Sequence, residues 1–142
     1  MKAKQFVPHF SVAALVVCMT VSNVDAADSA NWTGEYADKK FLNGQAVFQL
    51  SISQDGAAMK VSFDAVYNDG HGCAPEAEGA AKITSKGTLA FKFEDSSHNA
   101  GTGTITRAGS DVIVSLNATR VADPRCVVFY HENMRLVRQG KR

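Results

Sequence analysis

The side chains best suited to chemistry in this chain gather in a glycine-rich stretch near its middle, Asp69-Gly70-His71-Gly72-Cys73, which Glu76 and Glu78 follow closely. Polar loops held on a rigid scaffold commonly carry binding and catalytic groups, so this stretch is a candidate binding site. Asp69, His71 and a glutamate are also metal-ligand types, but their spacing matches none of the established metal motifs. Turn geometry beside a cysteine explains the glycines more simply, and we expect no metal here.

A second polar cluster surrounds His98, which is flanked by Asp95, Ser96, Ser97 and Asn99. These are the residue types of a Ser-His-Asp triad. However, five consecutive residues on one loop cannot easily supply the separate contacts of a nucleophile, a base and the group that orients the base. No oxyanion-hole element accompanies them. Such side chains commonly cap turns, so we expect a turn here instead of a catalytic centre.

A third pair, His131 and Glu132, lies inside the apolar run Cys126 to Val137, which we expect to form the last strand. Neighbouring residues of a strand point to opposite faces. If Glu132 points inward, it needs a partner such as Arg120 or Arg125, because a buried unpaired carboxylate is costly. In the other register His131 and Arg135 point inward and Glu132 is solvated. A solvated face or a structural ion pair is favoured over a polar anchor in a ligand cavity.

The beginning of the chain, Met1 to Ala26, has the pattern of a signal peptide. Two lysines precede an apolar run of about a dozen residues, and small or apolar residues precede Ala27. The run is shorter than the ~20 residues of a membrane-spanning helix. A lipoprotein signal is disfavoured because Val17, and not a small residue, precedes Cys18. We predict cleavage before Ala27, export to the periplasm or the exterior, and a single domain over residues 27–142.

The predicted exported part of the chain carries no excess charge. The whole chain has 15 basic and 14 acidic residues. The leader contains two lysines and one aspartate, so its removal leaves equal numbers of basic and acidic residues. Nothing in this balance attracts nucleic acid or an anionic membrane surface.

Two cysteines, Cys73 and Cys126, remain after the leader is removed. In an oxidising compartment they predict a disulfide, and the close histidine or cysteine partners that a metal site needs are absent. The bridge would close a loop of about 53 residues and stabilise the fold by ~4 kcal/mol in the chain-entropy model. It would also bring the segment Arg120 to Arg125 beside the stretch from Asp69 to Glu78.

Alternation of apolar and polar residues predicts a succession of short strands, clearest in Val47 to Ser53 and in the run Met59 to Ala65 beyond the turn signal Asp55-Gly56. The stretch Gly101-Thr102-Gly103-Thr104 has the look of a phosphate loop, but no helix follows it, so we assign it to a strand start. The expected strands cover residues 31–36, 47–53, 59–65, 80–84, 89–94, 102–107, 112–119 and 126–137.

Eight strands at roughly ten-residue spacing, without helical periodicity, indicate an all-β protein. A small antiparallel eight-stranded up-and-down barrel is favoured because one-sided alternation recurs in nearly every strand. Closure also removes the exposed edges that a two-sheet arrangement must protect. A β-sandwich is the alternative.

The opening Trp32-Thr33-Gly34-Glu35-Tyr36 and the long closing strand resemble those of small secreted lipocalin-like or avidin-like barrels, a likeness of architecture at the two ends of the chain. Size, leader and disulfide are also similar to those of periplasmic lysozyme inhibitors. These are small β-barrels that block an enzyme cleft with a loop. The resemblance implies a binding role, and it carries no inhibitory residue onto this sequence.

These observations favour a non-catalytic exported protein that engages or inhibits a protein partner through a disulfide-anchored loop, with no cofactor. The candidate binding residues are Asp69, His71, Glu76, Glu78, Arg120 and Arg125. One alternative is a barrel that holds a small apolar ligand among Phe48, Phe63, Phe91, Phe93 and Tyr130. A small hydrolase comes last, because the sequence offers no defensible nucleophile, metal set or acid–base pair.

Overall fold

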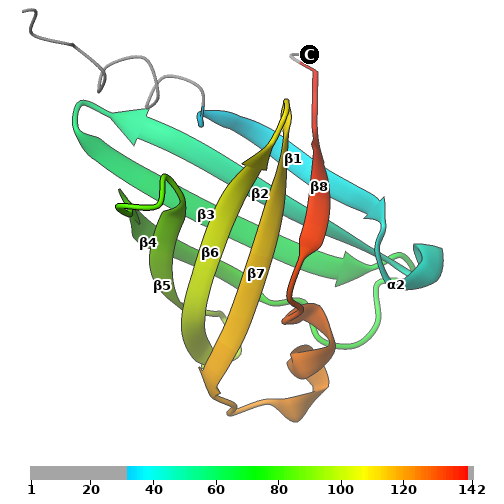
Figure 1. The fold of residues 1–142 in the computed structure, drawn as a ribbon. Helices are drawn as coiled ribbons and strands as arrows, with labels where there is room; N and C mark the ends of the chain where they lie inside the picture. The colour runs from blue at the N-terminus through cyan, green and yellow to red at the C-terminus, as the bar shows by residue number, and fades with distance from the viewer. Residues whose placement is uncertain (1–31, 141–142) are drawn as a thin grey trace, which may run out of the picture.

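The computed structural model describes residues 32–140, so the predicted signal peptide lies outside the described residues. Eight antiparallel strands form a closed barrel in which each strand pairs with its neighbour in sequence, and β8 closes the barrel against β1 (Figure 1). The predicted up-and-down barrel is confirmed, and the β-sandwich alternative is wrong. The strands are β1 (Gly34–Lys40), β2 (Ala46–Asp55), β3 (Ala58–Tyr67), β4 (Glu76–Ile83), β5 (Leu89–Glu94), β6 (Ala100–Ala108), β7 (Asp111–Arg120) and β8 (Met134–Arg138).

The alternation in the sequence corresponds to the two faces of the barrel wall. In β2 the side chains of Phe48, Leu50 and Ile52 are buried, and in β3 those of Val61 and Phe63 oppose them across the strand pair. The turn between these strands lies at Gly56, where φ is +60°, a conformation that glycine adopts without steric cost. The predicted hairpin with one buried and one solvated face is confirmed.

Two glycines of β6 are required by aromatic rings on β5. Phe91 lies opposite Gly103 and Phe93 lies opposite Gly101 in the register of the two strands. A Cβ on Gly103 would lie 2.2 Å from Cζ of Phe91, and a Cβ on Gly101 would lie 2.8 Å from Cζ of Phe93. At Gly101 the backbone carbonyl oxygen of Asn117 on the next strand would lie closer still, at 2.3 Å. The glycines therefore leave room for the rings and for that carbonyl, and the Gly-Thr-Gly-Thr stretch belongs to a strand, as expected.

Aromatic rings contact one another through the barrel interior. Phe48 stacks on Phe63 with ring centres 5.6 Å apart, and Phe63 meets Phe93 edge to face at 5.2 Å. Phe93 then contacts Phe91 at 6.4 Å and Tyr130 at 5.7 Å. These are ordinary distances for packed aromatic pairs. The five rings that were predicted as the lining of a ligand cavity are therefore in contact with one another.

The first and fourth strands differ from the sequence prediction. β1 begins at Gly34 and continues to Lys40, through residues predicted to be a loop, because Tyr36 to Asp38 pair with Leu50 to Phe48 of β2. A helical turn, α2 (Phe41–Gly44), follows it. β4 begins at Glu76, four residues before the predicted start, because its backbone already pairs with β3 from that residue.

The predicted closing strand over residues 126–137 is wrong in its first half. Residues Pro124–Phe129 form a 3₁₀ helix, η1, and β8 begins only at Met134. Asp123 caps η1 by accepting a hydrogen bond from the Arg125 backbone, and Pro124 occupies the first turn, where its missing N–H costs nothing. The apolar residues at 126–129 therefore bury one side of a helical turn and do not extend the sheet.

The two ends of the barrel are built from different segments (Figure 1). What we call the disulfide end contains α2, residues 68–75, the turn Asp95–Asn99, and residues 121–133 including η1. The opposite end contains residues 32–33, the β2–β3 and β6–β7 turns and the end of β8. Within residues 32–140, no helix has the length and apolar composition that crossing a bilayer would require.

Candidate functional site

The predicted disulfide between Cys73 and Cys126 is present, with Cα atoms 5.2 Å apart, a separation typical of such bonds. Both cysteines are buried. The bond fastens residues 68–75 to η1, so the loop that carries His71 is covalently attached to the segment that carries Arg125.

A buried polar network lies beside the disulfide. Asp95 is 4% exposed, and its Oδ1 accepts hydrogen bonds from the backbone N–H groups of Ser97 and Asn99 at 2.9 and 3.0 Å. Its Oδ2 accepts from the Asn99 side chain at 3.2 Å and from the Tyr130 hydroxyl. The carboxylate thus closes the β5–β6 turn, which is the capping role expected from the sequence.

Asn99 attaches this turn to the segment after β7. It is fully buried, and its Oδ1 accepts from the backbone N–H groups of Ala122 and Asp123 at 2.7 and 2.8 Å. Its Nδ2 donates to Asp95 and, at 3.0 Å, to the Tyr130 hydroxyl. All four hydrogen-bonding positions of the amide are therefore used. The network fixes the turn, the start of η1 and the segment after it in one arrangement.

Ser96 joins the same turn to the disulfide loop. Its backbone N–H donates to the Glu76 carbonyl at 2.8 Å, and its hydroxyl accepts from the Glu76 backbone at 3.1 Å. The hydroxyl also donates to the Ala74 carbonyl at 3.4 Å. The disulfide loop, the turn Asp95–Asn99 and the segment that contains η1 are consequently held to one another by hydrogen bonds as well as by the sulfur–sulfur bond.

Exposed ionisable side chains project from this framework. Arg120 forms an ion pair with Glu94 at 3.0 Å and donates twice to the His98 carbonyl at 3.3 Å. The His98 ring lies 3.7 Å from the same carboxylate. The hydrogen bond from Arg120, its positive charge and the nearby His98 together lower the pKa of Glu94 below its usual value. The His98 side chain is exposed, and its ring makes no contact with the Asp95 carboxylate. Ser97, His98 and Asp95 therefore do not form a catalytic triad.

Arg125 is held by its neighbour Asp123. Nε of Arg125 donates to Oδ1 at 3.0 Å and Nη2 to Oδ2 at 2.7 Å, a two-pronged geometry that fixes the guanidinium plane. The hydrogen bonds from the Arg125 side chain and backbone lower the pKa of Asp123. The Arg125 side chain is nevertheless 75% exposed.

The disulfide loop itself presents His71 and Asp69. The His71 backbone donates to Asp69 Oδ1 at 2.9 Å, and the His71 ring lies 3.9 Å from the same oxygen. Gly70 and Gly72 have φ values of +74° and +93°, so both positions suit glycine. Their role in turn geometry agrees with the expectation from sequence. The His71 side chain is 89% exposed.

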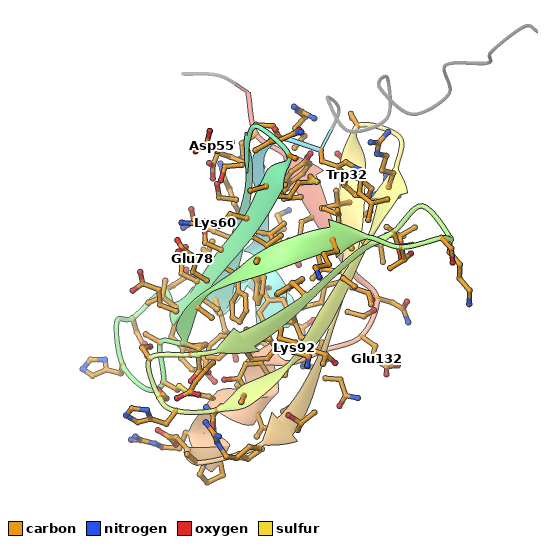
Figure 2. The ribbon with its side chains drawn as sticks, turned by 90° about the vertical axis from the view of Figure 1, so that its left-hand side faces the viewer. Trp32, Asp55, Lys60, Glu78, Lys92 and Glu132 are labelled. Atoms are coloured by element: carbon orange, nitrogen blue, oxygen red, sulfur yellow. A yellow bond between two sulfur atoms is a disulfide. The ribbon has the colours of Figure 1, made fainter. Side chains whose placement is uncertain are left out.

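The other two predicted acidic residues do not belong to this loop. Glu76 and Glu78 lie on β4, opposite Asp64 and Ser62 of β3. Glu78 forms an ion pair with Lys60 at 2.9 Å on the outer wall, and Figure 2 shows the two side by side above the disulfide end. The structure therefore places Asp69, His71, Arg120 and Arg125 at the disulfide end, whereas it separates Glu78 from them.

Glu132 is also exposed, in the connection between η1 and β8, and it points outward in Figure 2. Because this segment is not a strand, neither register proposed for it applies, and an interior carboxylate at this position is wrong. His131 is exposed as well, and its ring meets Phe41 edge to face at 5.7 Å.

Residues 32–140 bring one set of potential metal-ligand side chains together. Cys73, Cys126 and Asp123 are the one set of three whose ligand atoms come together there, and Asp69, His71 and the glutamates do not. The two sulfurs of that set are bonded to each other, and Asp123 is engaged with Arg125.

Sequence reasoning missed several residues of this end. His98 and Glu94 join Arg120 through contacts that depend on the β5–β6 turn lying beside the end of β7. Val121 and Val127 are 46% and 43% exposed next to the charged groups. Only the place of Val121 beside Arg120 and of Val127 beside Cys126 could have indicated this, because residue type alone does not show whether a side chain is exposed.

Fold and site together define a small closed β-barrel with a rigid, disulfide-stapled polar end. Comparisons with family models, with curated proteins and with solved structures gave no match for this chain.

Proposed function

We propose that this chain is an exported, non-catalytic binding protein whose disulfide end engages a protein partner. The observation that carries the proposal is the combination of exposed apolar and charged side chains on one rigid segment. Val121 and Val127 are exposed on either side of Arg125, between β7 and the end of η1. Protein interfaces combine apolar contact area with arginine in this way.

Rigidity supports the same proposal. The segment that carries these side chains is fixed by the disulfide, by Asn99 and by the Asp123–Arg125 pair. A surface that is already ordered loses little conformational entropy when it binds, so more of the contact energy becomes affinity. Arg120, Arg125, His71 and His98 project from this surface with side chains that are 58%, 75%, 89% and 82% exposed.

The charges of this end indicate the kind of surface it would meet. Arg120 and Arg125 are each paired with a carboxylate, Glu94 and Asp123. Neither sign dominates, so the partner surface would be polar with apolar patches and would not be a strongly acidic or basic one. An exported binding protein that blocks another protein's cleft fits this description, and its location outside the cytoplasm is part of the proposal.

The apolar-ligand alternative gains no support from the interior, because the rings of Phe48, Phe63, Phe93 and Tyr130 contact one another. The hydrolase alternative gains none from the polar cluster, since Asp95 and Asn99 are occupied with each other and with the backbone.

Site-specific photocrosslinking in the native host tests the proposal. A photoreactive residue replaces His71 or His98 at the disulfide end, or Lys82 on the outer wall. We expect one protein to crosslink from both histidine positions and not from Lys82. The variant Val121→Ser/Val127→Ser/Arg125→Ala should abolish that crosslink. Its matched control is Val66→Ser/Ile83→Ser, which removes two other exposed apolar side chains from the barrel wall.

Equal crosslinking from all three positions, or an unchanged crosslink in the disulfide-end variant, would show that this end is not the binding surface. All substituted side chains are exposed, so we expect each variant to keep the barrel fold. Circular dichroism of each variant checks this.

A further inference from the structure

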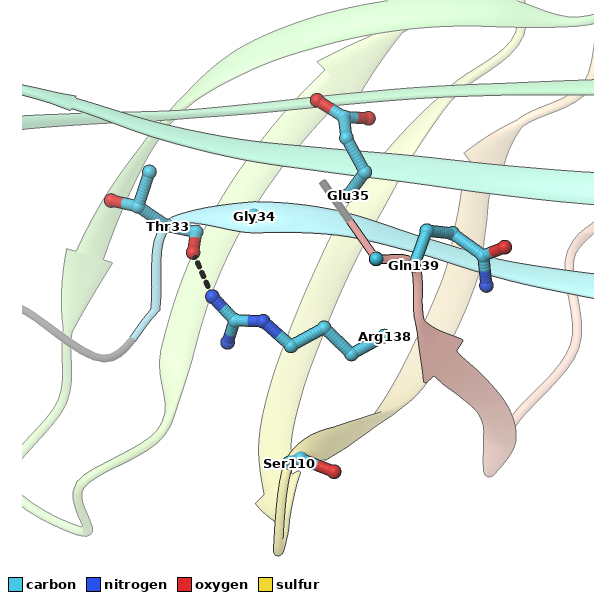
Figure 3. A pocket seen from close by; sticks show the side chains of 7 residues that line it. Thr33, Gly34, Glu35, Ser110, Arg138 and Gln139 are labelled. Atoms are coloured by element: carbon cyan, nitrogen blue, oxygen red, sulfur yellow. Dashed lines mark hydrogen bonds between the residues drawn. The ribbon is translucent and has the colours of Figure 1, made fainter. Parts of the chain in front are cut away.

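Arg138, the last residue of β8, organises the end of the barrel opposite the disulfide. Its Nη2 donates to the Thr33 carbonyl at 2.6 Å, as Figure 3 shows, and its Nη1 donates to the Tyr36 hydroxyl at 3.2 Å. The guanidinium carbon lies 5.5 Å from the centre of the Tyr36 ring. A Cβ at Gly34 would lie only 3.0 Å from Nη2, so this glycine leaves the space that the guanidinium occupies.

The acceptors that position Arg138 are neutral. A carbonyl and a hydroxyl hold the guanidinium, and no carboxylate of residues 32–140 lies within ion-pair distance of it. The nearby carboxylate of Asp111 forms an ion pair with Arg135 at 2.9 Å. From Arg138 it accepts a hydrogen bond of the backbone N–H and none of the guanidinium. Glu35 accepts from Ser51 at 2.7 Å, and Figure 3 shows it extending away from Arg138 on the other side of β1.

Three of the five N–H groups of Arg138 therefore remain available to a ligand, counting only partners in the described part of the chain. This contrasts with Arg125 and Arg135, whose guanidinium groups each meet a carboxylate. A guanidinium fixed in place by neutral acceptors is preorganised for the planar, two-pronged recognition of an oxyanion.

Two adjacent recesses open beside this guanidinium. One of about 460 Å³ is lined by Thr33, Gly34, Glu35, Ser110, Arg138 and their neighbours, and another of about 340 Å³ is lined by Tyr36, Arg107, Asp111, Val112 and the same Ser110 and Arg138. Arg107 adds a second guanidinium, which lies over the Trp32 ring at 4.4 Å. The side chains of Tyr36 and Val112 are buried and give the second recess an apolar floor.

We propose that Arg138 and these two recesses form a second binding site, which takes a small organic anion bearing a carboxylate or phosphate group. The oxyanion accepts hydrogen bonds from the Arg138 guanidinium and the Ser110 hydroxyl, and the organic part lies against Tyr36 and Val112. The recess volumes limit the ligand to a small molecule. This site is independent of the proposed protein-binding surface, because it occupies the other end of the barrel.

The test is an NMR titration of the protein purified after export with sodium propanoate and, separately, with sodium phosphate. Sodium chloride keeps the ionic strength constant, because screening alone would change surface contacts. We expect saturable shifts of the backbone amides of Gly34, Ser110 and Gln139 and of the Arg138 Nε–H. The two arms show whether the carboxylate or the phosphate is preferred.

The variant Arg138→Gln should lower the affinity for the preferred anion about tenfold or more, since it removes charge-assisted hydrogen bonds. Arg138→Lys keeps the charge without the planar fork and should bind with intermediate affinity. The matched control is Arg125→Gln at the disulfide end, which should bind like the wild-type protein.

Ser110→Glu keeps the test decisive if the loss of the Thr33 contact unfolds the Arg138 variants. Ser110 lies in the exposed β6–β7 turn, so its replacement leaves the barrel intact and places a competing carboxylate beside Arg138. We expect it to abolish the saturable shifts. Non-saturable shifts in the wild-type protein, or unchanged binding in Ser110→Glu or in a folded Arg138→Gln protein, would overturn the proposal.

Discussion

Tyr130 donates its hydroxyl hydrogen to the buried carboxylate of Asp95, which joins the segment after η1 to the turn after β5. The same hydroxyl accepts from Asn99, so three side chains close one network beneath the aromatic interior. A buried carboxylate is costly unless its oxygens are hydrogen-bonded, and each of the two Asp95 oxygens accepts two hydrogen bonds. The disulfide end therefore owes its fixed shape to polar contacts as much as to its covalent bond.

Removing the Tyr130 hydroxyl should expose the cost of an unsatisfied network. In Tyr130→Phe the ring still contacts Phe93, but Asp95 and Asn99 each lose a hydrogen-bond partner. We expect the free energy of unfolding to fall by about 1–3 kcal/mol, measured by urea denaturation. The control is Tyr67→Phe, because the Tyr67 ring packs on Phe129 while its hydroxyl makes no hydrogen bond within residues 32–140. Equal losses in the two variants would contradict a structural role for the network.

Arg120 should control the acid titration of Glu94. Arg120 lowers the pKa of Glu94 below its ordinary value of 4.5, so the pair contributes stability above that pH and loses it as the pH falls through the folded-state pKa. In Arg120→Gln we expect the Glu94 pKa, followed by NMR of the side-chain carboxyl carbon, to rise toward 4.5. Asp111 is the internal control, because its pKa is lowered by Arg138 and Arg135 at the other end. A Glu94 pKa that does not move would show that the ion pair does not persist in solution.

Loss of the disulfide should weaken the whole barrel. The bond spans 53 residues, and the chain-entropy model gives about 4 kcal/mol for a loop of this length. We expect Cys73→Ala/Cys126→Ala to lose roughly this amount in urea denaturation. Dithiothreitol should have the same effect on the wild-type protein and none on the variant. Peptide mapping without reductant that finds both thiols free would show that the bond does not form in the native protein.

The barrel could be predicted because strand alternation is a local property. Residues such as Phe48, Leu50 and Ile52 alternate with polar ones within a single strand, and the inward face follows from that spacing alone. The disulfide could be predicted because two cysteines remain once Cys18 is assigned to the predicted leader, and two cysteines permit one pairing. Gly103 was predicted correctly as a strand residue, whereas the strand already begins at Ala100, two residues before the predicted start. The reason for glycine at position 103, the ring of Phe91, lies on another strand.

The closing segment could not be predicted, because capping competes with apolar character there. Cys126 to Phe129 has the composition of a strand, but Asp123 and Pro124 start a helical turn just before it. The charged surface of the disulfide end was predictable only in part. His71 and Arg125 stand out in the sequence, whereas Glu94 and His98 meet Arg120 through a turn whose position depends on Asn99 and Tyr130. Such contacts between distant segments have no signature in the local pattern.

A side chain at position 103 should destabilise the barrel, because the Phe91 ring occupies the space that the new Cβ would need. The Cβ of Gly103→Ala would lie 2.2 Å from Cζ of Phe91 and 3.0 Å from Cδ2 of Leu116, so the ring must move within a filled interior. Overpacking of this kind costs about 1–3 kcal/mol, which urea denaturation measures directly.

A double-mutant cycle separates this clash from a general intolerance of β6. Phe91→Leu alone should destabilise the barrel by loss of ring contacts, but it also vacates the space that the new methyl group needs. The combined variant Phe91→Leu/Gly103→Ala should therefore be more stable than the two single losses predict, with a coupling of about 1 kcal/mol. Thr102→Ala, on the exposed face of the same strand, should show no coupling to Phe91→Leu. Additive losses in the Gly103 cycle would mean that the Phe91 ring does not rest on the glycine.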